Sequence, residues 1–216
     1  MRNDLNIGDV PLVSLDGLQQ LTSVVGAVAI DYNPKLETLD GLDHVQGMGS
    51  LELVMDPALE SLSGLVKLAH LGGKGGGGAL NYSLYLSDVP SLVELGLHAL
   101  TAMDGSVQII GTALPSFAGL ENLSSVGGSV YIRDALQLES FDGLNGLTSV
   151  NDITAWGCTK LVSLRALASL ESIPSGCLFR ENTKLPTCEV RWLEARLEKL
   201  GTSVGYSETD NAGICP

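Results

Sequence analysis

The feature that most constrains this chain is a repeat of about 23 residues in the positions of its leucines. The first column of the repeat holds Leu15, Leu39, Leu62, Leu95, Phe117, Phe141 and Leu164. The steps between them are 24, 23, 33, 22, 24 and 23 residues, and the one long step contains a glycine run. A period of this size is typical of a solenoid, in which each repeat forms one coil that stacks on the coil before it.

Six further apolar columns keep step with the first, so seven coils each supply the same seven inward positions. Two columns lie two residues apart, which is the spacing of side chains on one face of a β-strand. They are Val28, Leu51, Leu84, Val107, Val130, Ile153 and Cys177, and Ile30, Leu53, Leu86, Ile109, Ile132, Ala155 and Phe179. The first three columns lie three residues apart, which suits a 3₁₀ turn or a bent corner. Leu5, Ile7 and Leu12 predict an eighth, incomplete coil.

Turn-forming residues recur at two places in the coil. One corner position is shared by Gly17, Gly41, Gly64, Gly119 and Gly143. The turn after the strand is marked by Asn33-Pro34 and Asp56-Pro57, and we assign Asp88 and Asn182 to the same position. Short polar side chains bond the neighbouring backbone in such turns, so these residues are predicted to fix the geometry of the coil.

These patterns predict one elongated β-solenoid of the leucine-rich-repeat type, with about seven coils and short parallel strands. The solenoid is expected over residues 1–185, with a glycine-rich insertion at 72–80, and a C-terminal cap over 186–216. A bundle of short helices is disfavoured because the strand columns alternate at period two. No long stretch with a period of 3.6 residues occurs before the C-terminal region.

The cysteines predict how the last coil is covered. Cys188 and Cys215 both lie after the last coil. Between them, residues 189–201 carry a helical stripe that ends in a glycine, formed by Val190, Leu193, Leu197, Leu200 and Gly201. We expect this helix, stapled by a Cys188–Cys215 disulfide, to cover the apolar end of the solenoid. Such a bridge implies an oxidising compartment, and we expect Cys158 and Cys177 to be unpaired, half-buried thiols.

Charge and hydropathy exclude some classes of partner. The formal net charge is −13, whereas nucleic acids and anionic membrane surfaces bind clustered Lys and Arg. No run of about 18 apolar residues is present, so no transmembrane helix or direct membrane insertion is predicted. Residues 1–4 are polar and show no signal peptide. We therefore infer that natural sequence upstream of Met1 is missing.

No catalytic site, metal site or cofactor is predicted. His44, His70 and His98 lie on different coils without ligand spacing or an adjoining nucleophile. The glycine run around Lys74 lacks the Gly-x₄-Gly-Lys-Ser/Thr order of a nucleotide-binding loop. Asp16, Asp40 and Asp142 recur at one corner position, which indicates turn chemistry rather than a pair of catalytic carboxylates. We expect a protein that is not an enzyme.

The outward strand positions supply the candidate binding site. Between the two strand columns lie Ala29, Glu52, Tyr85, Gln108, Tyr131, Thr154 and Leu178, and the next outward position holds Asp31, Val54, Ser87, Ile110, Arg133, Trp156 and Arg180. One sheet face is thus predicted to carry Tyr85, Tyr131, Arg133, Trp156 and Arg180. Aromatic and arginine residues are enriched at binding hot spots, although strand faces also favour Tyr and Trp for packing alone.

The repeat resembles the receptor L-domain family, the right-handed leucine-rich solenoids of insulin- and epidermal-growth-factor-type receptors. The resemblance lies in the order of three motifs, which are Val-x-Ile, then Asn-Pro-x-Leu, then Leu-x-Gly-Leu-x-x-Leu-x-x-Val. Residues 28–45 and 130–150 carry this resemblance best. The ending Leu-Pro-Thr-Cys at 185–188, followed by a helix and Asn-Ala-Gly-Ile-Cys at 211–215, is similar to the C-terminal cap of secreted bacterial surface lipoproteins of the myxobacterial type. The resemblance implies a recognition role, because the same kind of sheet face contacts ligand in receptor L-domains.

We therefore expect a non-catalytic recognition module that is secreted or held at the cell surface, with any lipid anchor in the missing upstream segment. Its expected partner is a protein or a glycan that binds the parallel sheet face. No N-terminal cap helix and no cysteine-rich follower module is visible, so receptor-type hormone binding is not expected. The alternative is a structural or adhesive spacer that self-associates end to end through the uncapped N-terminal coil.

Overall fold

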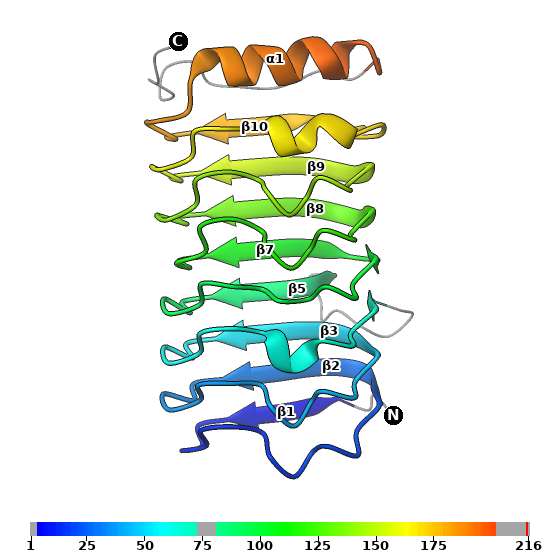
Figure 1. The fold of residues 1–216 in the computed structure, drawn as a ribbon, viewed down its shortest axis with the longest axis vertical. Coiled ribbons are helices and arrows are strands. Elements are labelled where there is room, and N and C mark those ends of the chain that lie inside the picture. Colours follow the sequence, from blue (N-terminus) through cyan, green and yellow to red (C-terminus); the bar gives the residue numbers. More distant parts are fainter. Residues whose placement is uncertain (1–3, 73–80, 202–214, 216) are drawn as a thin grey trace.

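The computed structural model describes residues 4–72, 81–201 and 215, which form a parallel β-solenoid of about seven turns with a C-terminal helix. Figure 1 shows the strands stacked along the long axis of the molecule, with the helix lying across one end. The predicted fold class is confirmed. Residues 73–80, which hold nearly all of the predicted glycine-rich insertion, lie outside the described residues.

The solenoid is built on one ten-stranded parallel sheet. Its long strands, in spatial order, are β1 (Leu5–Gly8), β2 (Ser23–Asp31), β3 (Gly47–Val54), β5 (Tyr82–Ser87), β7 (Ser106–Ile110), β8 (Ser125–Arg133), β9 (Ser149–Trp156) and β10 (Cys177–Arg180). Two short strands, β4 (His70–Leu71) and β6 (Ala102–Met103), pair between β3 and β8. The insertion follows β4 and precedes β5, so it interrupts the strand of a single coil.

The strand register matches the predicted columns. Val28 pairs with Leu51 and Ile30 pairs with Leu53, and the same two columns continue through every neighbouring strand to β10. All members of both columns are at most 3% exposed. Burying a side chain of this size stabilises a fold by roughly 1.5–3 kcal/mol, and in a solenoid that gain requires the neighbouring coil.

The corners explain the spacing of three residues between the first apolar columns. In one coil, the amide of Leu42 donates to the carbonyl of Leu39, and the amide of Val45 donates to the carbonyl of Leu42. The same chain of bonds recurs in other coils, and it is regular enough to form the 3₁₀ helices η1 (Ser63–Leu65) and η2 (Arg165–Ser169). Because each bond spans three residues, successive columns face the core together.

A ladder of buried amide and carboxyl side chains connects the turns after the strands. Asn33, Asp56 and Asn182 are completely buried. The backbone amide of Asn33 donates to Oδ1 of Asp56 at 2.8 Å, and the amide of Cys158 donates to Oδ1 of Asn182 at 2.9 Å. The assignment of Asp88 to this ladder is wrong. Asp88 is exposed, because it lies only two residues after its inward column, whereas Asn33 lies three residues after its own.

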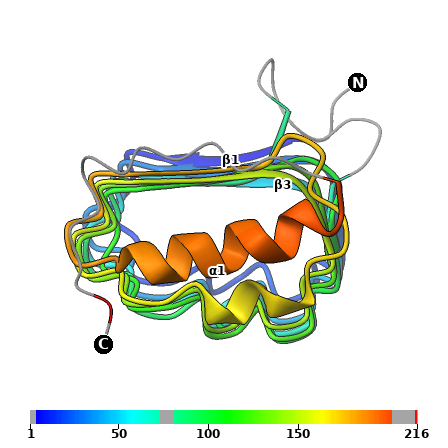
Figure 2. The same cartoon turned by 90° about the horizontal axis from the view of Figure 1, so that it is seen from above.

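The C-terminal helix α1 (Thr187–Glu198) begins two residues before the predicted segment. Its Val190, Leu193 and Leu197 are buried, and Gly201 adopts a left-handed φ of 75° after its end. The Cys188–Cys215 disulfide is present as predicted. Figure 2 shows α1 lying over the open end of the last coil, between the sheet and the corner helices.

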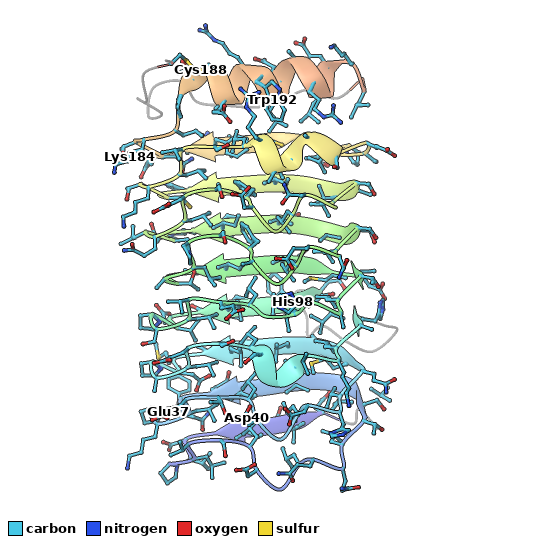
Figure 3. The ribbon with its side chains drawn as sticks, viewed as in Figure 1. Glu37, Asp40, His98, Lys184, Cys188 and Trp192 are labelled. Carbon is cyan, nitrogen blue, oxygen red and sulfur yellow. A yellow bond between two sulfur atoms is a disulfide. The ribbon has the colours of Figure 1, made fainter. Side chains whose placement is uncertain are left out.

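Glu189 anchors this cap to the coil beneath it. Its carboxylate accepts hydrogen bonds from the amide of Leu164 at 2.9 Å and from Nε of Arg165 at 2.8 Å. The Arg165 guanidinium in turn lies 4.3 Å from the ring centroid of Trp192, which Figure 3 labels together with Cys188 on α1. Charge-assisted bonds of this kind fix orientation as well as adding stability.

The two thiols without a disulfide partner are fully buried rather than half-buried. Burial raises the pKa of the Cys158 thiol and of the Cys177 thiol to about 12. Because the thiolate is the reactive form, we expect neither thiol of the folded protein to react with a thiol reagent such as DTNB at pH 8. Both should react after unfolding in urea. Rapid labelling of either cysteine without unfolding would contradict the buried positions.

Candidate functional site

The candidate site is the outer side of the parallel sheet, which we call the sheet face. It consists of the outward side chains of the long strands. Figure 2 shows the sheet as one flat side of the solenoid, with η2 on the opposite side. No helix covers the sheet face among the described residues. Parallel sheets usually have both faces covered, so this exposed one offers a broad surface for contact.

One row of the sheet face holds the two predicted tyrosines. Tyr85 on β5 pairs with Gln108 on β7, and Gln108 pairs with Tyr131 on β8. Neighbouring strands lie about 4.8 Å apart, so the two tyrosines stand roughly 10 Å from each other. Both are half-buried, and Gln108 lies between them in the row. The row therefore presents two phenol rings with one amide side chain between them.

The adjoining row holds the predicted cations and the tryptophan. Arg133 pairs with Trp156, and Trp156 pairs with Arg180. The Arg133 guanidinium lies 5.6 Å from the centroid of the Trp156 ring, and its Nε also donates to the Asp134 carboxylate at 3.1 Å. Trp156 remains 36% exposed. The structure therefore brings Tyr131, Arg133, Trp156 and Arg180 together on three neighbouring strands, with Tyr85 two strands away.

Sequence reasoning missed Tyr82, which stacks on Tyr85 with ring centroids 5.3 Å apart. Tyr82 pairs with Ser106, and the register between β5 and β7 shifts between Tyr82 and Leu84. This irregularity brings two tyrosines three residues apart into contact. A strict alternation of inward and outward residues cannot predict that contact, although the glycine insertion just before Tyr82 marks a place where the repeat is perturbed.

The two ends of the sheet face differ in charge. Asp31 on β2 and Glu52 on β3 lie toward the N-terminal end, and burial followed by the charge of Glu52 raises the pKa of Asp31. Arg133 and Arg180 lie on β8 and β10 toward the other end. A ligand that lies along the sheet face therefore meets carboxylates at one end and guanidinium groups at the other.

The histidines do not form a shared site. His70 lies 3.3 Å from Asp104, and His98 lies 3.1 Å from Glu121, with all four side chains about half exposed. Figure 3 labels His98 well away from α1. Across residues 4–72, 81–201 and 215, no group of three His, Cys, Asp or Glu side chains could hold a metal ion. The described helix is also too short and too polar to cross a membrane.

Comparison with known proteins identifies no relative. No protein-family model matches the chain, no curated protein matches it, and no solved structure matches it. The resemblance to receptor L-domains accordingly rests on the repeat motif alone, and the resemblance to bacterial surface lipoproteins rests on the C-terminal cysteine pattern alone.

Proposed function

We propose that this protein is a non-catalytic recognition module that binds a protein or a glycan through the sheet face. The observation that carries the proposal is the register that places Arg133, Trp156 and Arg180 side by side, next to Tyr131. Aromatic rings and guanidinium groups give large contact area and directional hydrogen bonds, and they dominate hot spots. In a chain with only 5% aromatic residues, this grouping on one exposed side favours recognition over packing.

The proposed location is the extracellular space or the cell surface. The Cys188–Cys215 disulfide indicates an oxidising environment. The resemblance to secreted bacterial lipoproteins supports a form held at the cell surface. Extracellular placement would present the sheet face to protein and glycan ligands.

The test uses alanine variants of the sheet face. Trp156→Ala and Tyr131→Ala should each weaken binding by about tenfold or more, measured on arrays of glycans and of extracellular proteins. Their melting temperatures should change little, because both side chains are partly exposed. Asp40→Ala, an exposed substitution on the corner side of the coil opposite the sheet face, is the control and should bind normally. Equal losses of binding and stability would show that the aromatic side chains serve packing.

A second candidate is an adhesive spacer that self-associates through its first coil. In that coil Leu12 and Val13 are 43% and 52% exposed, and Leu5 and Ile7 are only partly buried. The other end is covered by α1. Light scattering over a range of concentrations distinguishes the candidates, because a spacer should form oligomers that Val13→Glu abolishes. A monomer at all concentrations would exclude end-to-end association of this chain.

A further inference from the structure

A second surface lies beyond the edge of the sheet face, along the turns that follow the first strands. It is a groove of about 490 Å³, which we call the turn groove, lined by Asp9, Tyr32, Pro34, Met55, Pro57, Asp88, Pro90 and Gly111. These residues follow β1, β2, β3, β5 and β7, so the groove runs across neighbouring coils at the arrowheads of the lower strands in Figure 1. Its lining combines apolar side chains with two carboxylates and contains no basic side chain.

The backbone of the turn groove has an unusual regularity. One residue after each long strand adopts a left-handed conformation: Asp9, Tyr32, Met55, Asp88, Gly111, Asp134, Gly157 and Glu181. Their amides continue the ladder of the sheet, as when Tyr32 donates to Val54 at 2.8 Å and Met55 donates to Ser87 at 3.0 Å. Glycine and aspartate tolerate this conformation well. Tyrosine and methionine do not, and each costs roughly 1 kcal/mol there.

Tyr32 and Met55 adopt the left-handed conformation although neither side chain is buried. Their φ angles are 60° and 56°, and they are 55% and 46% exposed. The turn imposes this conformation in every coil. The feature that points to function is the presence of two large exposed side chains at positions that elsewhere hold glycine or an acidic residue. Beside them, Pro34, Pro57 and Pro90 are also exposed, so the groove presents several apolar side chains to solvent.

The carboxylates define the charge of the ligand. Along the turn groove, Asp9 and Asp88 lie on either side of Tyr32 and Met55. Asp9 and Asp88 follow strands that are three strand spacings apart, which is roughly 14 Å. Among residues 4–72, 81–201 and 215, no ion pair involves either carboxylate. Both are exposed. An extended peptide advances roughly 3.3 Å per residue, so two cationic side chains four residues apart span about 13 Å.

We propose that the turn groove binds an extended peptide with two basic residues four positions apart and an apolar residue midway between them. The basic side chains pair with Asp9 and Asp88, and the apolar side chain, which points to the same side of the peptide, contacts Tyr32 and Met55. The net charge of −13 attracts such a peptide from a distance. This site is independent of the sheet face.

The test measures fluorescence anisotropy with a labelled Lys-Thr-Leu-Thr-Lys peptide. We expect saturable binding that weakens as salt is added. A Thr-Lys-Leu-Lys-Thr peptide has the same composition but directs its lysines away from its leucine, and a Glu-Thr-Leu-Thr-Glu peptide reverses the charge. Both should bind about tenfold more weakly or not at all. Equal binding of the two lysine peptides, or no binding of the first, would overturn the proposal.

The variants separate the groove from the fold. The double variant Asp9→Asn, Asp88→Asn should weaken peptide binding about tenfold. The double variant Tyr32→Asn, Met55→Asn should weaken it by a similar factor. Asparagine tolerates the left-handed backbone, so the second pair should be at least as stable as the wild type. Trp156→Ala should leave peptide binding unchanged, which distinguishes failure here from failure of the sheet-face proposal. A peptide site would be contradicted if both double variants bound the peptide as the wild type does. It would also be contradicted if light scattering showed a wild-type dimer that became monomeric in the Tyr32→Asn, Met55→Asn double variant.

Discussion

Replacing Gly143 by alanine should destabilise the protein by about 4 kcal/mol, in the range of the most damaging single substitutions. Gly143 has a φ of 102°, which an alanine adopts only with strain. A Cβ atom there would also overlap the carbonyl oxygen of Phe117 in the preceding coil. The overlapping atoms are backbone, so relief requires the two coils to separate. Urea denaturation followed by circular dichroism measures the loss.

Gly17 provides a matched control for that prediction. It occupies the same corner in the first coil, with a φ of 111°, but no described atom lies within 4 Å of the position of its Cβ. Gly17→Ala should therefore cost only the backbone strain, about 1 kcal/mol. The difference between the two variants measures how closely the coils are stacked. Equal costs at Gly17 and Gly143 would show that the coils can move apart freely.

Replacing Asp56 by asparagine should stabilise the protein by about 2–3 kcal/mol at pH 8 and by little at pH 4. The carboxyl is completely buried. Its Oδ1 accepts two hydrogen bonds from Asn33, while its Oδ2 is buried and has no hydrogen-bond partner among the described residues. Burial first, and the charge of Asp31 to a lesser extent, raise the pKa of Asp56 to about 6 despite the bonds from Asn33.

The hydrogen bonds of the equivalent residues in other coils explain why an amide suits position 56 better than a carboxylate. Asn182 uses its Nδ2 to donate to the carbonyl of Ala155 at 3.0 Å, and Asn33 donates in the same way to the carbonyl of Ile7 at 3.1 Å. The equivalent carbonyl for Asp56 is that of Ile30. A carboxylate oxygen cannot donate to it, whereas a protonated carboxyl or an amide can.

The direction of the pH dependence follows from the raised pKa. Because Asp56 binds its proton more tightly in the folded state than in the unfolded chain, its favourable contribution is complete below about pH 4 and is lost as the pH rises through about 6. Thermal unfolding of the wild type and of Asp56→Asn at both pH values measures this effect. Asp40→Asn, an exposed carboxylate, is the control. An equal effect of Asp56→Asn at both pH values would contradict a buried, titrating carboxyl.

Much of the fold could be predicted from sequence because a solenoid turns periodicity directly into position. Once Val28 and Ile30 define a strand, adding one repeat gives Leu51 and Leu53, and the register confirms both pairs. The same counting would have excluded Asp88 from the buried ladder, since it lies two residues and not three after Leu86. The cap was predictable for a similar reason, because a stacked core must end at some surface.

The candidate sites were predictable only in part. Outward positions followed from the strand columns, so Tyr131, Arg133 and Trp156 were assigned to one face. The contact of Tyr82 with Tyr85 depends on a local shift in register, which apolar spacing does not record. The turn groove depends on left-handed residues. A sequence pattern predicts glycine or aspartate at such positions and gives no reason to expect Tyr32.

The uniform rise of the strands has a consequence for any partner that engages both surfaces. Each winding adds one strand, so the separation between the Tyr32 neighbourhood and the Arg133–Trp156 pair changes only in increments of about 4.8 Å. The distance between the two surfaces is therefore set by the number of repeats between them. Duplicating or deleting one internal repeat would lengthen or shorten that distance by one strand spacing and would leave the residues of both surfaces unchanged.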